Sequence, residues 1–286
     1  MSGILYLCAT PIGNLRDMSE RVLQTLQEVD LIAAEDTRNS LKLLNHFEIH
    51  TPMTSYHEFN KVEKADELVE KLRQGMNIAL ITDAGTPAIS DPGEVLVQKC
   101  AETGITVTSL PGACALITAL TVSGLPTRRF AFEAFLPSEK DDKKELNRIL
   151  DDLKKESRTI ILYEAPHRLQ KTLKLLYETL GNRRIALCRE LTKKFEDINR
   201  TDLEGAIAFY EQNEPRGEYV LVIDGFSHEE QQNRSIEDWN KLTIEEHMAY
   251  YEATIPDKKE AMKQVAKDRG ISKREVYQYL LKMIDK

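Results

Sequence analysis

The sequence has few of the features that mark secreted, membrane-spanning or metal-binding proteins. Its 286 residues include only four cysteines, at positions 8, 100, 114 and 188, and no two of them form a Cys-x-x-Cys pair. This usage is typical of reduced thiols and argues against a disulfide framework or a zinc site. No apolar run reaches about 18 residues, and the N-terminus has no basic segment followed by an apolar one. We therefore expect a cytoplasmic protein with no membrane span and no metal.

Several common sequence motifs are also missing. The chain has no G-x-G-x-x-G and no Walker P-loop, so the standard dinucleotide and phosphate sites are not supported. It has no G-x-S-x-G, the motif of a nucleophilic serine turn. The net charge of −8 disfavours non-specific nucleic-acid binding over the whole surface. Any contact with RNA would have to come from local basic patches.

One long polar loop stands out. An apolar run at residues 78–81 predicts a buried strand, and the segment after it, up to Gly93, carries two prolines, two glycines and two aspartates but no Lys or Arg. The segment Asp91-Pro92-Gly93-Glu94 has capping-box spacing with proline at the first helical position, which predicts a helix start capped by Asp91. About a dozen residues is long for a strand–helix connection, and such loops hold ligands in open α/β sheets. We interpret it as a binding loop.

Apolar strands alternate with amphipathic helices along most of the chain. This pattern predicts an α/β fold, with a mostly parallel sheet and helices on both faces in the first half. A break near residues 124–129 divides the chain into an N-terminal α/β domain at 1–124, a second α/β domain at 125–226, and a linker with a small helical domain at 227–286. Expected strands lie at 4–9, 31–34, 78–81, 105–110, 130–136, 159–163, 185–188 and 219–223. Expected helices include those capped by Ser19 and by Thr201, and a charged helix at 138–156.

The C-terminal tail has its own character. Residues 226–233 are polar and read as a linker, and residues 257–286 carry nine Lys or Arg against five Asp or Glu. Helices are expected at 258–269 and after Ser272, joined by Gly270, which is a helix-turn-helix pattern. A two-helix hairpin is more often a packing module than a nucleic-acid reader, so both interpretations stay open.

Charged residues follow the ends of several predicted strands. They occur at 34–38, 83–91, 163–168 and 189–194. One such set alone is more often a structural ion pair than a catalytic group. We expect the four sets to converge on one sheet edge, and this favours a functional site, because ion pairs alone need not share an edge.

Seven segments of the chain together form a recognisable set of motifs. They are Thr10-Pro11-Ile12-Gly13-Asn14-Leu15, Glu35-Asp36-Thr37-Arg38, Asp83 to Gly93, Pro111-Gly112-Ala113-Cys114-Ala115, Ser123-Gly124-Leu125, Glu164-Ala165-Pro166-His167-Arg168 and Arg189-Glu190-Leu191-Thr192-Lys193. In these motifs, residues 3–225 resemble the ribosomal RNA small-subunit methyltransferase I family, in the tetrapyrrole-methylase superfamily. Two departures are Ala134, where the family usually has Gly, and Cys114, where Ser is common.

The resemblance implies two α/β domains with S-adenosylmethionine in the cleft between them, and an enzyme that methylates the ribose 2′-hydroxyl of a cytidine in the decoding centre of 16S ribosomal RNA, acting as a homodimer. Methyl transfer to a hydroxyl needs no metal but benefits from a positioned base. The implied cofactor contacts are Pro11, Gly13, Gly85, Thr86, Pro87, Ile89, Ser90, Cys114, Ala115, Tyr163 and Glu164. Candidate bases are Asp91, Glu35, Asp36, Glu164, His167 and Glu190; we favour Glu190 and His167 because basic residues flank them, and keep Asp91 as a third catalytic candidate. The expected RNA patch is Arg38, Arg128, Arg129, His167, Arg168, Arg189, Lys193 and Lys194.

Two other functions remain open from the sequence. A small-molecule methylase on the same scaffold, acting on a porphyrinoid or a modified histidine, would also use arginines against substrate carboxylates. A non-catalytic RNA-binding assembly protein would need the basic face but not the uncharged loop at 84–90. Binding of the cofactor separates these classes.

Overall fold

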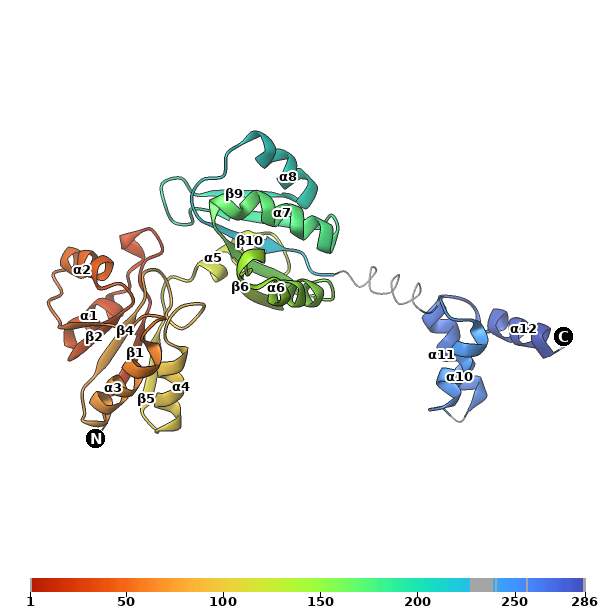
Figure 1. The fold of residues 1–286 in the computed structure, drawn as a ribbon, viewed down its shortest axis with the longest axis horizontal. Coiled ribbons are helices and arrows are strands. Elements are labelled where there is room, and N and C mark those ends of the chain that lie inside the picture. The colour runs from red at the N-terminus through yellow and green to blue at the C-terminus, as the bar shows by residue number, and fades with distance from the viewer. Residues whose placement is uncertain (1, 227–238, 240, 256, 285–286) are drawn as a thin grey trace. The chain divides into compact units, whose positions relative to one another are not determined.

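The computed structural model describes residues 2–226, 239, 241–255 and 257–284. They form two compact units, the first spanning 1–153 and 158–224, the second spanning 154–157 and 225–286 (Figure 1). The first unit contains two five-stranded sheets, and we refer to each sheet with its helices as a lobe. No helix in the described ranges is long and apolar enough to cross a membrane.

The first lobe is built on a parallel sheet with strand order β3-β2-β4-β1-β5. Its central strand β4 is apolar at every position, which is typical of a strand covered on both faces. Alternate residues serve two cores: Ile78 and Leu80 pack with α3 and α4, and Ala79 and Ile81 pack with α1 and α2. The elements are β1 (Ile4–Cys8), η1 (Leu15–Asp17), α1 (Glu20–Glu28), β2 (Leu31–Ala34), α2 (Thr37–His46), β3 (Met53–Ser55), α3 (Lys61–Arg73), β4 (Ile78–Ile81), α4 (Glu94–Glu102) and β5 (Thr106–Leu110).

The second lobe is built on a mixed sheet with strand order β6-β7-β10-β8-β9. Strand β10 runs antiparallel to both β7 and β8, so β7 and β8 point the same way and end at the same sheet edge, where β10 begins. Tyr219 at the start of β10 is in register with Glu164 on one side and Arg189 on the other. The elements are β6 (Phe130–Phe135), α6 (Glu139–Leu153), β7 (Thr159–Glu164), α7 (Pro166–Leu180), β8 (Arg184–Arg189), β9 (Asp197–Asp202), α8 (Leu203–Gln212) and β10 (Tyr219–Ile223).

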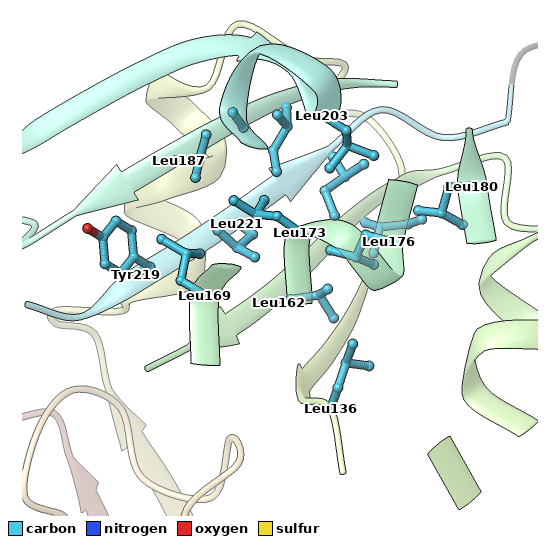
Figure 2. Close-up of a cluster of buried hydrophobic side chains, with 14 of the residues drawn as sticks. Leu136, Leu162, Leu169, Leu173, Leu176, Leu180, Leu187, Leu203, Tyr219 and Leu221 are labelled. Carbon is cyan, nitrogen blue, oxygen red and sulfur yellow. The ribbon is translucent and has the colours of Figure 1, made fainter. Parts of the chain in front are cut away.

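A leucine-rich core covers one face of this sheet. Leu169, Leu173 and Leu176 of α7 repeat at helical spacing and pack on strand residues such as Leu162 and Leu221 (Figure 2). All five are essentially inaccessible to solvent. At about 1.5–3 kcal/mol for each fully buried leucine, this layer is a large part of the lobe's stability and holds the carboxyl ends of β7 and β8 in place.

Helix α5 (Ala115–Val122) connects the two lobes. It follows β5 of the first sheet, yet Leu116, Ala119 and Leu120 pack against the second sheet, on the face opposite the leucine-rich core. The chain therefore crosses from one lobe to the other at residues 111–114. This packing would favour a domain boundary before α5; the expected boundary at residue 124 stays a prediction.

The second unit contains α10 (Ile244–Glu252), α11 (Lys258–Arg269) and α12 (Lys273–Ile284). A small core including Met248, Val265 and Val276 joins the helices. Buried His247 stacks on Trp239 with ring centroids 3.8 Å apart and accepts a 3.0 Å hydrogen bond from Arg269 Nε at its Nδ1. Gly270 closes α11 in the left-handed region and Ser272 caps α12, as expected, while α10 was not expected. Most of the expected linker at 226–233 lies outside the described residues.

The α/β prediction is confirmed, and three details of it are wrong. Strands β3 and β9 were not expected, because Met53–Ser55 and Asp197–Asp202 lack an apolar run. Helix α8 is capped by Asp202, whose carboxylate accepts from Gly205 N–H, and not by Thr201, which lies in β9 and pairs with Ile185 of β8. The four charged strand ends do not share one sheet edge: two belong to each sheet.

The predicted capping box at Asp91 is also wrong. Helix α4 begins at Glu94, and its N-cap is Gly93 at φ 147°, without a side-chain cap. A Cβ at Gly93 would lie 2.9 Å from that of Ala88, so glycine permits the close approach of the loop. The Asp91 carboxylate is thereby left out of the helix cap.

The alanine that departs from the family pattern lies in a strained position. Ala134 has φ 52°, in the left-handed region that favours glycine, beside an irregularity in the pairing of β6 with β7. An L-residue with a Cβ in this region costs about 1–2 kcal/mol.

We expect Ala134→Gly to stabilise the protein by about 0.5–1 kcal/mol, because the relief of left-handed strain exceeds the added entropy of the unfolded chain. The matched control is Ala131→Gly, at a buried position of the same strand with an ordinary backbone, which should destabilise. Urea unfolding of both variants tests this; equal losses would show that the backbone at residue 134 carries no strain.

Candidate active site

Backbone and side-chain hydrogen bonds join three loops of the first lobe. Thr10 and Gly85 pair through two backbone bonds of 2.9 and 3.0 Å, and Thr10 Oγ1 donates to the carbonyl of Thr82. Thr86 Oγ1 donates to the carbonyl of Ala113 at 2.9 Å. The loops after β1, β4 and β5 are thus held together at the carboxyl edge of the parallel sheet, where α/β folds place ligands.

These loops and the facing edge of the second lobe enclose a cavity of about 440 Å³. This volume is within the range of small-molecule sites, and apolar side chains form much of the wall. The lining residues are Ile12, Ala84, Gly85, Thr86, Ile89, Asp91, Cys114, Ala115, Phe135, Tyr163, Glu164, Ala165, Pro166, Cys188, Glu190, Leu191, Lys193, Glu218, Tyr219 and Val220.

Asp91 is the cavity carboxylate with an unusual environment. Burial, together with the negative charges of Glu35 and Asp83, raises its pKa from 3.8 to about 7. No hydrogen bond or ion pair to its side chain is present among the described residues. Asp91 can therefore both hold and release a proton near neutral pH.

Glu190 has the opposite environment. Burial alone would raise its pKa, but hydrogen bonds from the Glu218 N–H at 3.1 Å and from Lys193 Nζ at 3.0 Å outweigh burial and lower it. Lys193 Nζ also contacts Glu218 Oε2 at 2.7 Å. Glu190 is therefore a paired, ionised group and a weak base.

The remaining candidate bases are engaged elsewhere or lie off the cavity. Buried Glu164 accepts from Ala165 N–H and from the Thr172 hydroxyl, with Arg168 Nε at 3.4 Å. Hydrogen bonds from Arg38 lower the pKa of Asp36 to about 2. Burial raises the pKa of Glu35, which does not line the cavity. His167 is exposed on the first turn of α7 and does not line it either.

The structure brings seven of the eleven expected cofactor residues to the cavity wall. Pro11, Gly13, Pro87 and Ser90 are not part of the wall. Gly13 lies just behind it: a Cβ there would come 2.3 Å from Cγ of Lys193, so the glycine makes room for the Lys193 stem. The residues at the wall are Gly85, Thr86, Ile89, Cys114, Ala115, Tyr163 and Glu164.

The expected RNA patch is not one cluster of free cations. Arg38 pairs with Asp36, Arg168 donates to the Leu136 carbonyl, and Lys193 is bound by two carboxylates in the cavity wall. Arg189 is half-buried, and its Nε has no hydrogen-bond partner among the described residues. Arg128, Arg129 and Lys194 are exposed.

Several wall residues were not expected from the sequence. Glu218, Tyr219 and Val220 reach the cavity because β10 starts at the edge where β7 and β8 end. These residues could have been found only by knowing that the last strand lies antiparallel between β7 and β8. Apolar periodicity predicts a strand but not its direction or its place in the sheet. Ile12 and Phe135 lie in segments that were noted, without a role in binding.

This fold and cavity define a class of methylases. The family model for tetrapyrrole (corrin/porphyrin) methylases matches residues 5–207, so the chain belongs to that superfamily. Similar solved structures include a cobalt precorrin-4 methyltransferase (17% identity, TM-score 0.57, covering 77% of this chain and 94% of that one) and a uroporphyrin-III C-methyltransferase from Thermus thermophilus complexed with S-adenyl homocysteine (19% identity, TM-score 0.54, covering 78% and 97%). At these identities they show the fold alone.

Relatives with higher sequence identity define the family within this superfamily. The chain is 47% identical over 275 residues to ribosomal RNA small subunit methyltransferase I of Bacillus subtilis (strain 168), covering 96% of this chain and 93% of the relative. It is 48% identical over 282 residues to the protein of that name from Synechocystis sp., covering 98% of each. The chain belongs to the ribosomal RNA small subunit methyltransferase I family.

The hydrogen bonds of Glu190 depend on the absence of a side chain at Gly217. Gly217 has φ 76°, and a Cβ there would lie 2.5–2.7 Å from the carboxyl end of Glu190, whereas Gly181 has φ 77° with nothing within 4 Å. Both positions have positive φ, where an alanine is strained by about 1–3 kcal/mol. Gly217→Ala should lose about 1–3 kcal/mol more than Gly181→Ala in urea unfolding at pH 7, because Glu190 must leave its hydrogen bonds. Equal losses would contradict the arrangement.

The second prediction concerns Asp91 and pH. Between about pH 4 and pH 7 the folded protein holds a proton on Asp91 that the unfolded chain releases, so Asp91 lowers stability as pH rises through this interval. Asn cannot ionise, so Asp91→Asn should be more stable than the wild type by about 1–2 kcal/mol at pH 8, after allowance for partial exposure, and equal to it near pH 4. Asp36→Asn, at a carboxyl with a lowered pKa, should instead lose stability at pH 7. A pH-independent effect of Asp91→Asn would contradict the shift.

Proposed function

We propose that this protein transfers a methyl group from S-adenosylmethionine to the ribose 2′-hydroxyl of a cytidine in the decoding centre of 16S ribosomal RNA. The observation that carries the proposal is the identity of 47–48% over nearly the whole chain to relatives named as ribosomal RNA small subunit methyltransferases. The cavity adds the second support, because it offers a base suited to a hydroxyl acceptor.

The cavity wall fits the cofactor. Glu190 and Glu218 outnumber the one ammonium of Lys193, which suits a ligand whose sulfonium and amino groups give it positive charge. Gly85, Thr86, Cys114 and Ala115 present small side chains and backbone groups to it. When bound, S-adenosylmethionine supplies a methyl group on a positively charged sulfur, which a hydroxyl oxygen can attack.

Asp91 is the base in this proposal, in place of Glu190 and His167. A ribose hydroxyl is a weak nucleophile, so a general base that removes its proton should accelerate the methyl transfer. Among the cavity carboxylates, Asp91 combines a free side chain with a pKa near neutrality, while Glu190 is held by Lys193 and Glu218 N–H. Tyr163 lines the same cavity, and burial together with the charge of Asp91 raises the pKa of the Tyr163 hydroxyl.

We place the reaction on the small ribosomal subunit in the cytoplasm. The homodimer implied by the resemblance stays a prediction. Among the described residues, no group of three or more Asp, Glu, His or Cys side chains is placed to hold a metal ion.

The test is transfer of a labelled methyl group from S-adenosylmethionine to small ribosomal subunits that lack the modification, with the product mapped to base or ribose. Label on the ribose of a decoding-centre cytidine is the expected result. Cofactor binding without transfer to subunits or to naked ribosomal RNA would move the function to a small-molecule methylase. Absence of cofactor binding would overturn the methyltransferase assignment.

The proposal predicts a pH profile for the base. Single-turnover transfer by the wild type should rise with pH and level off above about 7, as Asp91 loses its proton. Asp91→Asn should slow the step roughly 10²–10⁴-fold, remove this dependence and leave cofactor affinity within a few-fold. Glu190→Gln is the comparison, and a profile that persists in Asp91→Asn would exclude Asp91 as the base.

A further inference from the structure

We propose that Phe195, with Lys194 beside it, forms a stacking platform for an unpaired nucleobase of the RNA substrate. The inference rests on the proposed function and adds a recognition element to it. Phe195 is 67% exposed, although a phenylalanine side chain gains from burial, and it lies in the turn between β8 and β9. The first half of the same turn, at Glu190, Leu191 and Lys193, lines the cavity.

The turn holds Phe195 in a defined position. Glu190 and Thr192 both have left-handed backbones, at φ 50° and 65°, which non-glycine residues keep only where surrounding contacts impose them. Those contacts are present: the Glu196 carboxylate accepts from Thr192 N–H at 2.6 Å, and two backbone bonds, Lys193 N to Glu190 O and Glu196 N to Lys193 O, close the turn. A rigid exposed aromatic ring loses little entropy when a ligand stacks on it.

Of the two lysines in the turn, Lys193 is held by carboxylates, and Lys194 is paired with none among the described residues. Glu190 and Glu218 are bound to Lys193, and Glu196 is bound to the turn's own backbone. The ammonium of Lys194 lies 5.6 Å from the Phe195 ring centroid and forms no ion pair within the described part of the chain. An exposed ring with an adjacent cation is the combination that single-stranded nucleic acid favours, since every base has a face and every nucleotide a phosphate.

The distance from the cavity suits a nucleotide. Phe195 is two residues beyond the wall residue Lys193, so their Cα atoms are at most about 7 Å apart. A ribose whose hydroxyl enters the cavity therefore carries its own or a neighbouring base into reach of the ring. Such a base must be unstacked from the RNA, and the platform would compensate for the lost stacking.

The first experiment measures affinity for unmodified small ribosomal subunits by filter binding. Phe195→Ala should weaken binding about 5- to 20-fold, and Phe195→Leu should weaken it similarly because an aliphatic side chain cannot stack, while Phe195→Trp should retain wild-type affinity. Phe209→Ala is the matched control: Phe209 is 46% exposed on α8, away from the cavity wall, and its removal should leave affinity unchanged. Lys194→Gln should reduce the slope of log Kd against log salt by about 1.

The second experiment identifies what lies on the ring. Photocrosslinking from p-benzoylphenylalanine at position 195 should label 16S ribosomal RNA, and the same group at position 209 should not. A crosslink from position 195 to a ribosomal protein, or none, would overturn the platform, as would equal affinity of Phe195→Ala and the wild type. Each variant is first shown to bind S-adenosylmethionine like the wild type.

The two proposals fail in different ways. If the wild type does not methylate small subunits, the proposed function is wrong. If the wild type methylates them and the Phe195 variants do so with unchanged KM, the proposed function stands and the stacking platform is wrong.

Discussion

The pairing of Thr10 with Gly85 is the constraint on which the cavity depends. These two backbone bonds join the loops after the adjacent strands β1 and β4, and the Thr86–Ala113 bond adds the loop that leads into α5. Once the three loops are joined, Gly85, Thr86 and Ala115 can only lie on one wall. The second lobe supplies the other wall from the edge where β7 and β8 end and β10 begins.

Two carboxylates of the cavity have opposite environments. Asp91 is partly buried near the negative charges of Glu35 and Asp83, which raises its pKa. Glu190 accepts hydrogen bonds from a backbone N–H and an ammonium, which lower its pKa. Carboxylates whose environments move their pKa values in opposite directions mark different roles in an enzyme. Under the proposed function, Asp91 is the group that takes the proton, and Glu190 with its partners fixes the turn that continues to Phe195.

The sequence predicted the strands that carry apolar runs and the family, but not every element or contact. Runs such as residues 78–81 and 219–223 were assigned correctly because burial on both faces needs them. Strand β9, Asp197–Asp202, is a polar edge strand, and no local pattern distinguishes it from a loop. The capping box at Asp91 followed local rules, but the close approach of Ala88 to Gly93 moved the helix start to Glu94.

Only part of the site could be predicted from the sequence. Wall residues inside recognisable motifs, such as Gly85 and Tyr163, were found, whereas Glu218 and Val220 reach the wall only through the direction of β10. The preference for Glu190 and His167 as bases was drawn from flanking basic residues. The ion pair between Lys193 and Glu190 depends on the backbone conformation of the turn, which the sequence does not show. The acidic neighbours of Asp91 include Glu35, which is distant in the sequence, so local patterns could not reveal them.

The crossing of α5 has a consequence for how the two lobes fold and persist. Cutting the chain at residue 124 would leave α5 on the first lobe with Leu116 and Leu120 exposed, and would uncover Ile161 and Val222 on the second sheet. Neither fragment would bury its own apolar surface. The two lobes should therefore unfold in a single cooperative transition. Neither lobe should be stable when it is expressed without the other, despite the two separate sheets.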